Sequence, residues 1–142
     1  MSTSRIFPKA SLLLCVLAYQ PLAFSQTHDG QKLQELEAQD YDLRAKAMAA
    51  RMSLMQDLFD TSERDFKTGG LTNCVIEGTA RLEEIGESEQ YATNSLTPGT
   101  VFLRDKPDQA DYATAIFTRK LVISRYELAR ETLKSCVAKH GR

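Results

Sequence analysis

The sequence predicts an all-α protein: an elongated antiparallel bundle of three helices, or four if residues 86–106 form a short extra element, with one disulfide. Two long segments place apolar residues at helical spacing and contain neither proline nor glycine in their interiors. A Gly-Gly pair separates the first of these segments from another helical pattern. Two cysteines lie where antiparallel packing of the last two helices would bring them together.

The N-terminus has the features of a secretory signal peptide. A short basic segment precedes an apolar run, Ala10 to Tyr19, which is shorter than the roughly 20 residues of a membrane-spanning helix. Small residues at Ala23 and Ser25 fit the positions just before a signal-peptidase cut. We therefore expect residues 1–25 to be cleaved, with an uncleaved membrane anchor as the alternative.

Cleavage would leave residues 26–142 as a single helical domain without stable membrane insertion. Of the chain's 18 basic and 19 acidic residues, two basic ones lie in the signal, so 16 remain against 19. This balance gives no general attraction for nucleic acid or anionic lipid. An export signal without a lipid-attachment motif predicts a periplasmic protein, and secretion is the alternative.

Two cysteines, Cys74 and Cys136, follow the predicted signal. An even number of cysteines in an exported chain indicates a disulfide, and two free buried thiols are the alternative. Cys74 opens the second predicted helix and Cys136 closes the third, so antiparallel packing would bring their sulfurs together. The same register places Ile85 near Tyr126.

Residues 31–66 predict the first helix, on the order of 50 Å long, because they are rich in good helix formers. A loose segment from Gln26 to Gly30 precedes it, and a break near Asp60 to Arg64 is the alternative to one continuous helix. The apolar residues that we expect to face the core are Leu33, Leu36, Tyr41, Met48, Met52, Met55, Phe59 and Phe66. The alternative for the three methionines is an adaptable binding groove or a soft-metal site.

Lys67 to Gly70 is the clearest turn in the chain, because two consecutive glycines permit positive φ. We expect Thr72 to cap the second helix. The apolar stripe of this helix comprises Leu71, Val75, Gly78, Leu82 and Ile85. Glycine in a helix costs about 1 kcal/mol, so Gly78 predicts the close approach of a neighbouring helix.

The third helix is predicted from Pro107 to His140, with Pro107 in its first turn and Asp105 as its cap. Its apolar face is wide enough to touch two neighbours. The connection at residues 86–106 is long for a compact bundle, and such loops are often functional or mobile. A passive lid over the exposed part of the third helix is the simpler interpretation of this loop, and a functional or mobile loop is the alternative.

The sequence contains no recognisable catalytic set. His28 and His140 are the only histidines, and each lies near a chain end, a poor place for a positioned base. There is no HExxH, CxxC or CxxCH motif. Cys136 and His140 have the i,i+4 spacing of metal ligands, but a disulfide-bonded cysteine is the better interpretation. We therefore predict a protein that is not an enzyme and carries no cofactor or metal.

We predict a non-enzymatic exported protein that binds a protein partner in the cell envelope, in the manner of an immunity protein or inhibitor. The motivation is a small, disulfide-linked scaffold without a catalytic set. The candidate partner-binding residues lie on the acidic end of the first helix and around the long loop: Asp57, Asp60, Glu63, Tyr91 and Phe102. The alternatives are a periplasmic chaperone or envelope-assembly adaptor with a methionine-rich groove, and a small-ligand or metal carrier.

Overall fold

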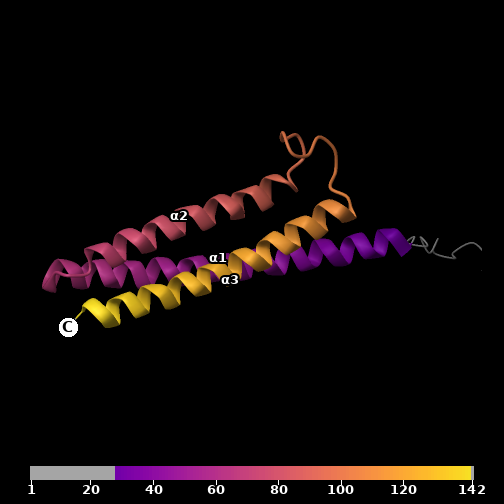
Figure 1. Ribbon diagram of the computed structural model, residues 1–142. Coiled ribbons are helices and arrows are strands. Elements are labelled where there is room, and N and C mark those ends of the chain that lie inside the picture. Colours follow the sequence, from indigo (N-terminus) through magenta and orange to yellow (C-terminus); the bar gives the residue numbers. More distant parts are fainter. Residues whose placement is uncertain (1–27, 142) are drawn as a thin grey trace, which may run out of the picture.

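The computed structural model describes residues 28–141, so the predicted signal peptide at residues 1–25 lies outside the described part of the chain. Three helices account for most of it: α1 (His28–Thr68), α2 (Thr72–Asn94) and α3 (Gln109–His140). Each helix reverses the direction of the one before, and together they form an elongated bundle (Figure 1). The predicted all-α architecture is confirmed, and residues 28–141 contain neither a strand nor a fourth helix.

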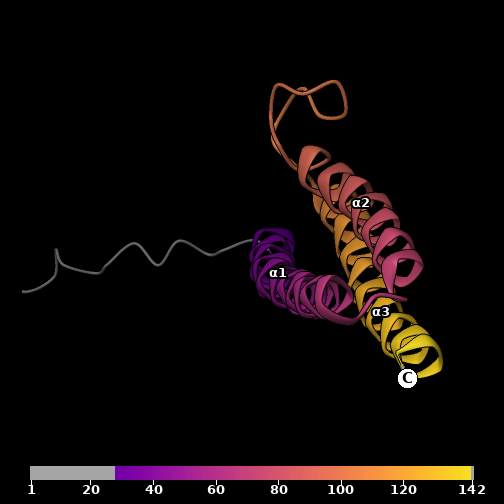
Figure 2. The same ribbon diagram turned by 90° about the vertical axis from the view of Figure 1, so that its left-hand side faces the viewer.

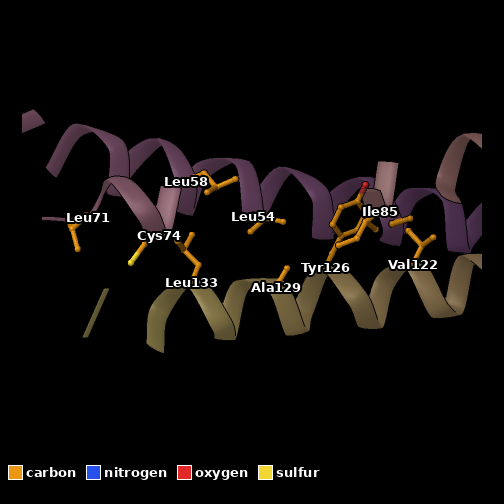
Figure 3. Packing of buried hydrophobic residues seen from close by; sticks show 10 residues of the cluster. Leu54, Leu58, Leu71, Cys74, Ile85, Val122, Tyr126, Ala129 and Leu133 are labelled. Carbon is orange, nitrogen blue, oxygen red and sulfur yellow. The ribbon is translucent and has the colours of Figure 1, made fainter. Parts of the chain in front are cut away.

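The core runs along the middle of the bundle and receives side chains from all three helices. Viewed from the end, α2 and α3 run side by side while α1 lies to one side of them (Figure 2). In the close view of the packing, Leu54 of α1 lies opposite Ala129 of α3 (Figure 3). The buried cluster comprises Ala47, Leu54, Leu58, Leu71, Cys74, Ile85, Val122, Tyr126, Ala129 and Leu133.

The first helix differs from the prediction in its bounds and in its buried face. It begins at His28 and runs to Thr68 without the break considered near Asp60 to Arg64. The buried residues of α1 are Asp40, Leu43, Ala47, Leu54, Leu58 and Thr61. The prediction that the three methionines pack in the core is wrong, because they are between 42% and 64% exposed. Two stripes with helical spacing run along α1. The stripe with the smaller side chains, which contains Ala47, faces the bundle.

Gly78 has the role predicted for it. A Cβ atom built on this residue would lie 2.5 Å from Cδ2 of Leu58. The absence of a side chain therefore lets α2 approach α1 closely enough for Leu58 to lie against its backbone.

The turn between α1 and α2 uses Gly69 and Gly70, both with positive φ. The prediction that Thr72 caps α2 is wrong. Asp65 supplies the cap from the last turns of α1: its Oδ1 accepts the backbone N–H of Leu71 at 2.6 Å, and its Oδ2 accepts the Thr72 hydroxyl at 2.7 Å. A side chain from the preceding helix thus satisfies the Leu71 N–H at the start of α2, which has no partner within the helix.

The start of α3 also lies later than predicted. Its cap is Asp108 rather than Asp105, and Pro107 precedes the helix. The Asp108 carboxylate accepts the N–H groups of Ala110 and Asp111, and the Asp111 carboxylate accepts the Asp108 N–H. This reciprocal pair is a capping box, which fixes the first helical residue at Gln109.

The disulfide between Cys74 and Cys136 is present, with 5.8 Å between the two Cα atoms. It joins the start of α2 to the end of α3, as the antiparallel hairpin predicts. Ile85 and Tyr126 lie in the same buried cluster and neighbour one another in Figure 3. Further along the hairpin, Arg125 bonds to the Glu84 carboxylate at 2.7 Å.

A buried ion pair joins the helices near the other end. Asp40 of α1 is 2% exposed and Arg119 of α3 is 1% exposed. The Arg119 Nε atom donates to Asp40 Oδ1 at 2.6 Å, and both terminal guanidinium nitrogens lie 3.5 Å from the Thr93 hydroxyl of α2. Arg44 donates to the second Asp40 oxygen at 2.7 Å. These bonds leave no buried side-chain nitrogen or oxygen unpaired in residues 28–141.

The disulfide should contribute strongly to stability. Replacement of Cys74 and Cys136 together by serine should lower the free energy of unfolding by about 4 kcal/mol, because the bridge closes a long loop in the unfolded chain. Urea unfolding with and without reductant measures this effect. Reductant should destabilise the wild type and leave the serine variant unchanged; equal stability of the oxidised wild type and the variant would contradict the prediction.

The buried ion pair should depend on both of its members. Arg119→Met should cost about 3–5 kcal/mol, because it leaves the Asp40 carboxylate in the core without its main partner. The double variant Asp40→Leu/Arg119→Met should recover most of this loss, since apolar side chains of similar size replace both charges. A double-mutant cycle by chemical denaturation tests the coupling, and additive losses would show that the two charges act independently.

Candidate functional site

The end of the bundle that carries the α2–α3 loop presents a small apolar surface. Tyr91 of the last turn of α2 meets Phe102 of the loop, with ring centroids 5.1 Å apart and planes at 72°. This edge-to-face geometry is favourable for aromatic rings. Both rings remain about half exposed, and the adjacent Val101 is 88% exposed. We call Tyr91, Val101 and Phe102 the apolar tip.

The loop that carries the apolar tip is shorter and more ordered than the predicted segment at residues 86–106. Helix α2 continues to Asn94, so the irregular part covers residues 95–108. Leu96 and Leu103 are buried and anchor its two sides. The Thr100 hydroxyl donates to the Asn94 carbonyl at 2.9 Å and accepts the Leu103 N–H at 3.2 Å. These contacts hold Val101 and Phe102 outward between two fixed points.

The predicted acidic residues of α1 are bonded within the protein. Asp57 accepts from Nε of Arg130 on α3 at 2.8 Å, and this hydrogen bond raises the pKa of Arg130. Asp60 accepts from the Gln56 amide at 2.8 Å, and Glu63 pairs with the Lys67 ammonium at 2.6 Å. Asp60 and Glu63 are exposed, so only Asp57 is held between helices.

The structure does not bring the acidic residues and the apolar tip together. Asp40 lies at the level of Thr93, because Arg119 contacts both side chains. Asp57 is about 25 Å further along α1, at 1.5 Å per residue. The candidate surface therefore divides into two parts. The apolar tip lies at one end of the bundle, and the acidic segment, residues 57–65 of α1, lies beyond its middle.

A second polar cluster in the bundle escaped the sequence reasoning. The Tyr126 hydroxyl donates to the Glu89 carboxylate at 3.0 Å, and Arg51 lies 3.8 Å from the same carboxylate. Burial and the bond to Glu89 raise the pKa of Tyr126. The cluster joins one residue from each helix, so it helps to position the three helices relative to one another. Its signal in the sequence is the polar hydroxyl that Tyr126 adds to an apolar stripe.

The two histidines and the disulfide cysteine beside His140 do not come together as a ligand set in residues 28–141. His28 begins α1 and His140 ends α3, so the two imidazoles lie at opposite ends of the bundle (Figure 1). Cys136 is bonded to Cys74 and is unavailable as a ligand beside His140. No group of three or more histidine, cysteine or acidic side chains within the described range is placed to bind a metal ion. No described helix has a stretch long and apolar enough to cross a bilayer.

Asp65 closes the acidic segment and makes stability depend on pH. Its bonds to the Thr72 hydroxyl and the Leu71 N–H lower the pKa of the Asp65 carboxyl below its ordinary 3.8. A carboxylate with a lowered pKa stabilises the folded state above the unfolded pKa, and this contribution disappears as the pH falls through the folded pKa. Asp65→Asn should therefore destabilise the protein at neutral pH and much less at acidic pH.

Carboxyl titration by NMR tests the cause of this effect. Thr72→Val removes the largest contribution and should move the Asp65 pKa up toward 3.8. Thr68→Val is the matched control, because the Thr68 hydroxyl donates to the Arg64 carbonyl and not to Asp65. An unchanged Asp65 pKa in the Thr72→Val variant would refute the assignment.

No family model, no curated protein and no solved structure matches this chain. The candidate surfaces therefore follow from the chain's own sequence and geometry.

Proposed function

We propose that the protein is a non-enzymatic, exported protein of the periplasm that docks onto a protein partner through the apolar tip. The observation that carries the proposal is the tip itself. Tyr91 and Phe102 form an ordered edge-to-face pair beside the exposed Val101, on a loop with two buried anchors. Apolar side chains that gather on an exposed surface commonly mark an interaction site, and loops on rigid scaffolds commonly carry binding residues.

The geometry of the tip favours a protein partner over a small ligand. A small-molecule site encloses most of its ligand in a concave pocket. The tip is instead a convex group of three side chains, and residues of the Tyr and Phe type are enriched at the buried centre of protein interfaces. Because the loop is already folded, docking would cost little ordering entropy. The acidic residues Asp60 and Glu63 are too distant to share this contact.

Site-specific photo-crosslinking in cells tests the proposal. A benzophenone analogue of phenylalanine in place of Phe102 should give one discrete adduct with another protein. The matched control is the same analogue in place of Phe117 of α3, which is 70% exposed against 52% for Phe102. The proposal fails if the Phe102 position gives no adduct or the same adducts as the Phe117 position.

Once the adduct is identified, Phe102→Ala should weaken binding of the purified partner about 30-fold, a hot-spot loss of about 2 kcal/mol. Asp60→Asn should leave this affinity unchanged. Calorimetry or surface binding of the two variants measures the difference, and an effect of Asp60→Asn as large as that of Phe102→Ala would move the contact to the acidic segment.

A further inference from the structure

Helix α1 carries a second apolar stripe that the bundle leaves uncovered. Its three aromatic side chains, Tyr41, Phe59 and Phe66, are between 66% and 93% exposed. The three methionines lie between them and are also exposed. We call the full set the outer stripe: Tyr41, Ala45, Met48, Met52, Met55, Phe59, Ser62 and Phe66.

The spacing of the outer stripe is that of a coiled-coil seam. Steps of four and three residues alternate along it without interruption. At 3.6 residues per turn, the stripe lies about 120° around α1 from the buried residues. A second helix can therefore pack against it without displacing α2 or α3.

The stripe is large enough to be the centre of a dimer interface. Each aromatic side chain presents about 150–250 Å² when uncovered. At the exposures observed here, the three rings alone expose on the order of 450 Å² in one copy, within the roughly 300–600 Å² of the largest apolar patch on a typical monomer. Two such stripes, with their methionines, approach the roughly 1,200 Å² at which specific interfaces begin.

The pattern of the stripe is the same when it is read from either end. It starts and finishes with a step of four residues, so two antiparallel copies align every position with an apolar or small one. Met52 then faces Met55 of the second copy, Met48 faces Phe59, and Tyr41 faces Phe66. Ala45 faces Ser62 in the remaining layer.

The charges of α1 favour the antiparallel orientation over the parallel one. Residues 41–51 contain three exposed basic side chains and one exposed acid. Residues 56–66 contain four acids and one base; Asp57 and Asp65 are bonded within the bundle, and Asp60 and Glu63 are exposed. An antiparallel pair sets the basic half of each helix beside the acidic half of the other, and a parallel pair would set like charges together. Opposite charges beside a helical seam determine partner and orientation.

We propose that the outer stripe is covered by the outer stripe of a second copy, so that two molecules associate through antiparallel α1 helices. Self-association explains why the spacing of the stripe reads the same from either end and why the two halves of α1 carry opposite charge. Binding of an unfolded client would require neither feature. The interface is separate from the apolar tip, so the dimer would carry two tips.

The first test measures whether the protein, after processing by its host cell, is a monomer or a dimer in solution. Analytical ultracentrifugation should show a reversible monomer–dimer equilibrium. Met52→Glu should raise the dissociation constant by a factor on the order of 100 or more, because two carboxylates would leave water without partners. Leu121→Glu places the same charge at a similarly exposed apolar position of α3 and should change nothing. Since Met52 is exposed in the single molecule, circular dichroism should show both variants folded.

The second test determines the register. Met48→Cys/Phe59→Cys should form interchain disulfides on mild oxidation, because these two positions face each other across the dimer. They are about 16 Å apart in one helix, beyond the roughly 7 Å between Cα atoms that a disulfide can span. Met48→Cys alone should not cross-link, whereas a parallel dimer would link it efficiently.

Several results would overturn the proposal. A monomer at all concentrations would refute it, as would a dimer that survives Met52→Glu or a parallel cross-linking pattern. A monomer that binds an apolar dye through the stripe and protects client proteins from aggregation would assign the surface to the chaperone alternative. The apolar-tip proposal is tested separately, because crosslinking from position 102 can still be measured in the Met52→Glu variant.

Discussion

The contact on which the bundle's alignment depends most is the buried ion pair between Asp40 and Arg119. It is made by the only two charged residues that are fully buried in the described chain. A charge in a core is costly unless it is paired and hydrogen-bonded, so a sliding of one helix along another would expose this cost directly. Because Arg119 also reaches the Thr93 hydroxyl, one guanidinium fixes the level of all three helices. The ion pair therefore fixes the register of the helices more than it adds net stability to the fold.

The opposite end of the hairpin is fixed by a covalent bond. The Cys74–Cys136 bridge holds the start of α2 to the end of α3, about 25 Å along α3 from Arg119. Between these two points the packing uses Gly78, whose missing side chain admits Leu58, and the Tyr126–Glu89 bond. The bundle can thus be slender because its two ends are aligned by specific contacts and the middle needs only close packing. That slenderness also leaves much of α1 uncovered.

Sequence reasoning located the helices and the hairpin, because the glycine turn and two cysteines restrict the topology to one simple solution. It chose the wrong face of α1, since two stripes share the helical period and the methionine–phenylalanine stripe is the more apolar. Two charged residues lie at helical spacing within the stripes that are buried: Asp40 is three residues before Leu43, and Arg119 lies between Ile116 and Val122. A charge in each stripe was the sequence signal of a buried ion pair. Capping by Asp65 was unpredictable because it spans a turn. Tyr91 and Phe102 were named individually, but their contact depends on how the loop folds.

The disulfide also divides the chain unequally. It makes residues 74–136 a closed ring and leaves α1 as an arm attached at Gly69 and Gly70. In the denatured, oxidised chain the ring has lost conformational freedom while the arm keeps all of its own. The entropic saving on refolding belongs to the α2–α3 ring, and the arm must recover its place through side-chain contacts alone. The ion pair of Asp40 with Arg119 is the strongest geometric constraint on that recovery.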